Sequence, residues 1–170
     1  MIEIRQLDGN DVWGQIEGLS AVLVDCVEGG ASVNFMAEFS MDDAALFFES
    51  VADAVDRGER LAFAAFDGEE VLGTVQVMLR TPPNQPHRGE IAKLLVRRTS
   101  RGQGVAQQLM EAAEAAAREA GKTLLTLDTA SDAAERLYER MGWTRVGVIP
   151  NFALLPDGTP CATIFFWKQL

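Results

Sequence analysis

The apolar positions of the chain follow two patterns, alternation or short continuous runs in some segments and a spacing of three to four residues in others. The first pattern is typical of strands and the second of helices. Predicted strands cover residues 2–7, 61–66, 71–79, 91–96, 123–128, 144–149 and 161–168. Predicted helices cover residues 11–27, 42–57, 103–120 and 132–141. Glycine follows each helical segment, and Asp67-Gly68 predicts a hairpin turn between the second and third strands.

The order of these elements predicts one mixed sheet. Strands that are joined through a helix are expected to lie parallel after a right-handed crossover, and strands joined by a short turn are expected to pair antiparallel. The helices are expected to cover the faces of this sheet. No repeat, low-complexity tract or long linker interrupts the pattern, so residues 1–170 are predicted to form a single domain.

The composition is that of an ordinary globular domain, but its charge is strongly acidic. Of the 170 residues, 48% are hydrophobic and 24% are charged, and the formal net charge is -10. An acidic surface repels polyanions, so neither nucleic acid nor an anionic membrane surface is an expected partner. A cationic substrate such as an amine fits this charge better.

The two cysteines, Cys26 and Cys161, stand far apart in the sequence. Their spacing gives no zinc motif and no disulfide framework, so no metal site is expected and both are interpreted as small buried hydrophobic residues. The first residues lack a basic region followed by an apolar stretch, and no apolar run approaches the roughly 20 residues of a membrane span. These features predict a cytoplasmic protein.

A glycine-rich turn between the strand at 91–96 and the helix at 103–120 is the most informative segment. It reads Arg101-Gly102-Gln103-Gly104-Val105-Ala106. The start of a helix offers free N–H groups and a partial positive charge, and glycine lets the backbone approach a ligand closely. This combination predicts a site for a phosphate or pyrophosphate. The alternative is a turn whose glycines serve only its geometry and whose arginines are solvated.

A second block follows in the predicted helix at 132–141 and the residues after it. It reads Ala133-Ala134-Glu135-Arg136-Leu137-Tyr138-Glu139-Arg140-Met141-Gly142-Trp143. Together, the 101–106 turn and this block resemble the GNAT superfamily of N-acetyltransferases, whose patterns are Arg/Gln-x-x-Gly-x-Gly/Ala and Asn-x-x-Ala-x-x-Leu-Tyr-x-x-x-Gly-Phe. Ser131 stands where the family has asparagine, and Trp143 stands where it has phenylalanine.

The resemblance implies an α/β fold with a mixed, mostly antiparallel sheet flanked by helices, and acetyl-CoA as the cofactor. Implied cofactor contacts are Leu94, Leu95, Val96, Arg101, Gly102, Gln103, Gly104, Val105, Ala106 and Ser131. The pantetheine arm is expected to follow residues 94–96 through main-chain hydrogen bonds, as a strand added to a sheet edge would. A homodimer is possible by the same resemblance.

A narrower resemblance concerns segments at 127–129, 134–138, 149–153 and 156–158, which look like tabtoxin resistance acetyltransferases. It implies an acceptor that is a small amino-acid-like molecule with a primary amine. The first alternative is acetylation of protein lysines or N-termini, which needs an open groove rather than a closed pocket. The second is a non-catalytic acyl-CoA-binding module, which would lack a working proton donor.

Four side chains are candidates for proton transfer. By resemblance, Tyr138 protonates the departing thiolate, and its phenol stays protonated at neutral pH because its ordinary pKa is near 10. Glu90, at the start of a predicted strand, and Asp128, at the end of another, are candidate bases, and Asp128 is also a candidate for binding the substrate ammonium. His87 has an ordinary pKa that suits proton transfer at neutral pH, and it is predicted to contact the substrate. The alternative for Tyr138 is a tyrosine that only packs in the core, and the alternative for the charged candidates is an exposed residue without a catalytic role.

The loop at 30–40 is expected to cover the acceptor pocket, with Asn34 and Phe35 lining it. Ordinary loop packing is the alternative for both residues.

Overall fold

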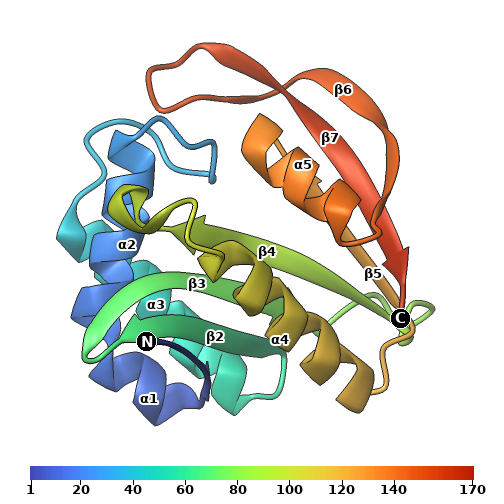
Figure 1. Cartoon of the computed structure of the whole chain (residues 1–170), viewed down its shortest axis with the longest axis horizontal. Coiled ribbons are helices and arrows are strands. Elements are labelled where there is room, and N and C mark those ends of the chain that lie inside the picture. The colour runs from blue at the N-terminus through green and yellow to red at the C-terminus, as the bar shows by residue number, and fades with distance from the viewer.

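The computed structural model describes residues 1–170 as one seven-stranded sheet with helices on its faces (Figure 1). Its elements are β1 (Ile2–Leu7), α1 (Gly9–Gly14), α2 (Ile16–Glu28), α3 (Met41–Asp56), β2 (Arg60–Asp67), β3 (Glu70–Met78), β4 (Arg88–Val96), a 3-10 turn η1 (Arg98–Ser100), α4 (Val105–Glu119), β5 (Leu124–Thr129), α5 (Asp132–Arg140), β6 (Thr144–Leu154) and β7 (Pro160–Gln169). The strand order is β1-β2-β3-β4-β5-β7-β6, and only β4 and β5 pair in parallel. The predicted mixed, mostly antiparallel sheet is therefore confirmed.

The clearest differences from the sequence-based prediction concern three elements, while other boundaries shift by one or two residues. The helix predicted at 11–27 is two helices that meet at Gln15, and α1 starts earlier because Asp8 caps it with a side-chain hydrogen bond to the Asp11 amide. β4 starts at Arg88, so Glu90 lies inside the strand rather than at its start. β6 runs five residues further than predicted, to Leu154, because the hairpin closes in a tight turn.

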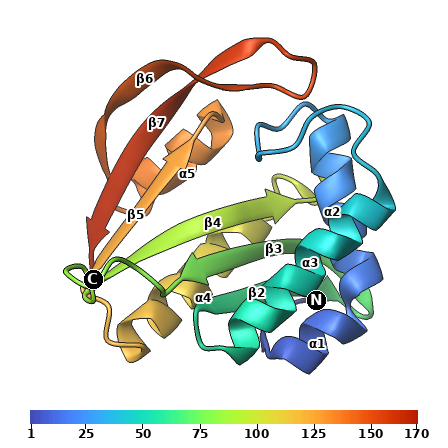
Figure 2. The ribbon, with the colours of Figure 1, turned by 180° about the vertical axis from the view of Figure 1, so that it is seen from behind.

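Helices on opposite faces of the sheet bury two separate cores, because successive side chains of β2 point to opposite faces. Phe63 packs in the core under α4, and Ala62, Ala64 and Phe66 pack in the core under α1, α2 and α3. Figure 2 shows α1 to α3 on the side of the sheet opposite α4. None of the helices is long and apolar enough to cross a membrane.

The sheet splits in its middle. β4 and β5 pair only through their first residues, with Arg88 opposite Leu124 and Glu90 opposite Thr126, and then diverge (Figures 1 and 2). Beyond Glu90, β4 therefore has no strand beside it on this side. β5, α5 and Leu155 after β6 line one side of the opening, and β4, the end of α2 with the loop after it, and the start of α4 line the other.

A bulge in β4 lies at the split. Thr74 is paired with Leu95 and Gln76 with Ala92, so β4 contains one residue more than β3 between these pairs. Lys93 lies within this extra length and has a φ of 53°, in the left-handed region that few residues other than glycine adopt. The bulge bends β4 where it leaves β5.

The far end of the opening is bridged by two loops. The Ala37 amide donates to the Pro156 carbonyl at 2.8 Å, and the Cys161 thiol donates to the Ser32 hydroxyl at 3.4 Å. These bonds join the loop after α2 to the β6–β7 hairpin.

Candidate active site

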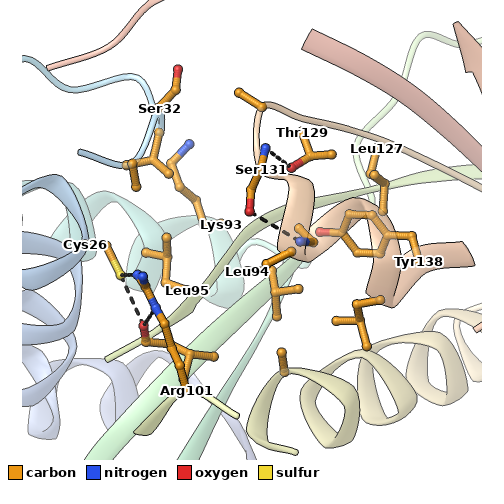
Figure 3. A pocket seen from close by; sticks show the side chains of 18 of the residues that line it. Cys26, Ser32, Lys93, Leu94, Leu95, Arg101, Leu127, Thr129, Ser131 and Tyr138 are labelled. Carbon is orange, nitrogen blue, oxygen red and sulfur yellow. Dashed lines mark hydrogen bonds between the residues drawn. The ribbon is translucent and has the colours of Figure 1, made fainter. Parts of the chain in front are cut away.

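The split in the sheet contains a cavity of about 910 Å³. Its walls come from the loop after α2, from β4, from the turn into α4, from the end of β5 and from α5 (Figure 3). The two sequence blocks, which are far apart in the chain, therefore face one space.

The turn into α4 forms one end of this cavity. Gly102 and Gly104 have φ values of 77° and 81°, a conformation that glycine adopts without strain. Gly104 is the N-cap of α4 and provides no side-chain cap, so the N–H groups of the first helical turn are available to a ligand. Apart from the Gln108 amide at 3.9 Å, no atom lies within 4 Å of where a Cβ at either glycine would be. The turn can thus hold a pyrophosphate against its backbone.

Not all of the predicted cofactor residues of this turn line the cavity. Gly102, Gly104 and the first residues of α4, Val105 and Ala106, line the cavity. Gln103 does not line it, and its side-chain amide donates to the Thr99 carbonyl at 3.3 Å. Gln103 therefore holds the turn in shape.

Arg101 also lines the cavity, but its guanidinium points toward α2 (Figure 3). Its Nε donates to the Val96 carbonyl at 3.3 Å, and its Nη2 lies 3.9 Å from Cys26 Sγ. Burial raises the pKa of the Cys26 thiol, so this cysteine stays protonated and unreactive. Arg101 thus ties the turn to β4 and α2.

The free edge of β4 forms the floor of the cavity. Leu94, Leu95 and Val96 all line it. Leu95 points into the core under α2 and α3, whereas Leu94 and Val96 pack on the core under α4. Since β5 has diverged here, this edge can accept an extended ligand such as a pantetheine arm by strand-like hydrogen bonds. The cavity residues therefore fit acetyl-CoA at both its pyrophosphate and its pantetheine.

Tyr138 combines a buried ring with a hydroxyl that faces the cavity. It is 4% exposed, and its ring packs on Trp143 at 5.9 Å and on Phe166 at 5.6 Å. Figure 3 shows the hydroxyl pointing into the cavity. Burial, with a smaller contribution from Asp128, raises the pKa of the phenol well above its ordinary value. The hydroxyl is thus held protonated.

The two candidate carboxylates also reach the cavity. Asp128 is exposed at the end of β5, and its Oδ2 accepts a hydrogen bond of 2.7 Å from the buried Thr163 hydroxyl. Glu90 is half-exposed and lies 3.6 Å from Arg88 Nη1. Ser131 lines the same cavity, and its hydroxyl caps α5 by accepting from the Ala134 amide.

The residues predicted to contact the acceptor separate into two groups. Asn34 lines the cavity. Phe35 does not, because its ring packs against Phe39 at 4.2 Å and Phe47 at 5.5 Å. His87 is exposed on the loop before β4 and does not line the cavity.

A smaller cavity of about 460 Å³ adjoins the first one. Its lining includes polar residues that the sequence analysis did not single out, among them Arg60, Gln76 and Lys93. The available signal was that Gln76 and Lys93 interrupt strands that are otherwise apolar. A polar residue at such a position requires a partner or a function.

Comparison with known proteins identifies the family of the chain. The model of the acetyltransferase (GNAT) family matches residues 31–143. A crystal structure of an N-acetyltransferase from Staphylococcus aureus Mu50 is 19% identical, with a TM-score of 0.82, covering 99% of this chain and 98% of that one. YncA, a putative acetyltransferase from Salmonella typhimurium with its cofactor acetyl-CoA, is 18% identical, with a TM-score of 0.80, covering 99% and 94%.

A putative phosphinothricin N-acetyltransferase is 16% identical, with a TM-score of 0.80, covering 100% of this chain and 99% of that one. At these identities, the likeness to solved structures shows a shared fold. The narrower resemblance to tabtoxin resistance acetyltransferases stays a prediction. Since the family model covers well over half of the chain, the protein belongs to the acetyltransferase (GNAT) family and is an enzyme that uses acetyl-CoA.

Proposed function

We propose that this enzyme acetylates a primary amine of a small amino-acid-like molecule, and that the amine attacks the donor directly. The observation that carries the proposal is that Tyr138, Asp128 and the glycine turn all line one cavity, with the Tyr138 hydroxyl pointing into it (Figure 3). When bound, acetyl-CoA supplies a thioester for the amine to attack.

Each group of the chain has a distinct task in this proposal. The turn at 101–106 binds the pyrophosphate, and the free edge of β4 orients the pantetheine. The Asp128 and Glu90 carboxylates hold the substrate ammonium and take up the proton that the amine loses. Tyr138 provides a proton to the departing sulfur. No covalent adduct with the enzyme is needed.

The bridged ends of the cavity support a small acceptor over a peptide. The β4–β5 pairs close one end of the split, and the Ala37–Pro156 and Cys161–Ser32 hydrogen bonds bridge the other. An extended peptide would need an open groove past this bridge.

Thiol release from acetyl-CoA tests the proposal. The panel contains free amino acids, simple amines, and peptides with a lysine or a free N-terminus, and mass spectrometry identifies each acetylated product. We expect the free amino acids to give the highest kcat/KM. Preferential turnover of peptides would establish the protein acetyltransferase alternative, and acetyl-CoA binding without turnover would establish the non-catalytic module.

The exposed edge of the sheet supports a second proposal, a homodimer. β6 is the outer strand, and its exposed apolar side chains are Val146, Val148, Ile149, Phe152 and Leu154. Such an edge offers unpaired backbone groups to a second copy of the chain. Light scattering is expected to give the dimer mass for the wild type and the monomer mass for Val148→Lys. A wild type that stays monomeric at every concentration contradicts this proposal.

A further inference from the structure

We propose that the smaller cavity binds an anionic group of the acceptor, a carboxylate, so that the acceptor is a zwitterionic amino acid rather than a simple amine. This inference rests on the proposed function and names the part of the acceptor that the second cavity holds.

Strand register brings the residues of the smaller cavity together. Arg60 on β2 pairs with Met78 on β3, which pairs with Glu90 on β4. One row further, Gln76 on β3 pairs with Ala92 on β4. Paired residues point to the same face of a sheet, so these side chains share one surface. It is the face that α2 and α3 cover, since Ala62, the partner of Gln76 on β2, packs in their core.

Two residues that line the cavity have hydrogen-bond donors without partners. The Gln76 side chain is fully buried, and its Oε1 accepts from Arg60 Nη1 at 2.6 Å. The Nε2 of the same amide and the Nε of Arg60 are buried and make no hydrogen bond. Buried polar atoms without a partner are uncommon in folded proteins because they lose their bonds to water. Both atoms are donors, so the missing partner is an acceptor.

The charge of the cavity points to an anion. Arg60 and Lys93 are half-buried, and neither forms an ion pair with a carboxylate of the chain. Burial lowers the pKa of Lys93, and the charge of Arg60 lowers it further, while Asp128 and Glu90 raise it. Two cations therefore lie close together, and the acidic side chains near them stay beyond ion-pair distance.

The other charged residues of the cavity already have partners. Arg80 pairs with Glu59 at 2.7 Å. Arg88 donates to the Gln85 and Thr126 side chains and lies 3.6 Å from Glu90, the one acid that lines this cavity. An anionic ligand would thus complete the bonding of Arg60, Gln76 and Lys93. This local excess of positive charge contrasts with the net charge of -10 of the whole chain.

The smaller cavity lies where one end of an acceptor could reach it. Asn34, Glu90, Ala92 and Lys93 line both cavities, so the two spaces meet at β4. An amino acid can place its ammonium near Asp128 and Glu90 and its carboxylate near Arg60 and Gln76. A carboxylate has two oxygens and accepts from a guanidinium and an amide at once.

Matched substrates test this inference. Thiol release is measured for a panel of free amino acids and for the methyl ester of each one, which keeps the amine and removes the negative charge. We expect kcat/KM to be at least about tenfold higher for the free acids, a difference of about 1.4 kcal/mol. In Arg60→Met this ratio should fall toward one, and Arg60→Lys should restore part of it.

The controls separate charge from folding. Arg57→Gln removes the same charge from an exposed residue outside both cavities, and it should keep the wild-type ratio. Acetyl-CoA affinity and thermal unfolding verify that each variant folds. If Arg60→Met does not fold, Gln76→Glu introduces a negative charge at the same place and should also reduce the ratio.

Two outcomes would overturn the inference. One is a wild type that uses acids and esters equally well, and the other is an Arg60→Met enzyme that keeps the wild-type preference. If no amine releases thiol, the proposed function fails by itself. Calorimetric affinities of the same acids and esters for the complex with coenzyme A then decide the carboxylate site, and binding of neither, or of both equally, refutes it.

Discussion

The two cavities that meet at β4 use different kinds of groups to bind a ligand. The cofactor part of the larger one relies on backbone: a turn with two glycines, the start of α4 and the free edge of β4. The smaller one relies on side chains, chiefly Arg60, Gln76 and Lys93, from three separate strands. A backbone site suits a cofactor that many enzymes share, and a side-chain site suits a substrate that distinguishes one enzyme from another. The difference predicts that donor binding and acceptor choice can be changed independently.

The largest effect is expected from Tyr138→Phe, which removes one hydroxyl and keeps the ring. General acid catalysis contributes about 10²–10⁴-fold, so kcat should fall in that range, while KM for acetyl-CoA should move much less. If the two cavities act separately, kcat should fall equally for an amino acid and its methyl ester. Wild-type kcat in the variant, measured where chemistry limits the rate, would show that water or another group supplies the proton.

Gly104→Asp tests the backbone site. The substitution adds a side chain and a negative charge where the turn faces the cavity, so Kd for acetyl-CoA should rise more than about tenfold, or about 1.4 kcal/mol, in a calorimetric titration. Gly121→Asp is the matched control, because Gly121 has nearly the same φ, 80° against 81°, and follows the other end of α4. Equal Kd values for the two variants would contradict the assignment of the turn.

The pH dependence of stability tests whether folding raises the pKa of the Tyr138 phenol. Burial raises the pKa of this phenol in the folded state, so the unfolded state releases the proton first, and the free energy of unfolding should fall as pH rises above about 10. One pH unit above that value, the loss approaches about 1.4 kcal/mol, provided that the folded phenol is still protonated.

Ultraviolet absorbance can follow the ionisation of this phenol directly, because Tyr138 is the only tyrosine in the chain. The phenolate absorbance should appear together with unfolding, and Tyr138→Phe should lack this component of the pH dependence. A phenolate that appears near pH 10, as in a free tyrosine, while the protein stays folded would show that water reaches the hydroxyl.

The smallest effect is expected from Asp128→Asn, because this carboxylate is exposed. An exposed charge contact is worth about 1 kcal/mol at most, and Glu90 remains to take up the proton, so KM for the amine should rise roughly fivefold. Kd for acetyl-CoA should stay close to the wild-type value. Glu139→Gln removes the same charge from an exposed position of α5 outside the cavity and should change neither constant. Equal changes in both constants for Asp128→Asn would assign Asp128 a structural role.

The contrast between the cavities also explains what the sequence could predict. The glycine turn and the Tyr138 block are continuous segments, and their chemistry depends on order along the chain, so a pattern reveals them. Arg60, Gln76 and Lys93 become neighbours only through the pairing register of β2, β3 and β4 and through a bulge. Register is a property of the folded sheet, and period alone does not determine it.

The order of elements along the chain and most element boundaries followed from the spacing of apolar residues. Long periodic segments such as 103–120 and alternating strands were predictable because burial imposes their period. The interruption of the first helix at Gln15 was not, because the apolar spacing continues across it. The placement of Phe35 in an aromatic cluster depended on the path of the loop after α2, on which periodicity carries no information.

The bridge between the loop after α2 and the β6–β7 hairpin has a consequence for the timing of each catalytic cycle. It consists of two hydrogen bonds, one of which uses a thiol, a weak donor. Local opening there should cost far less than global unfolding, so we expect the bridge to act as a latch that admits the acceptor and releases the product. The Ala37 amide proton, which the latch holds, should exchange with solvent through this opening, and a bound acceptor should slow that exchange.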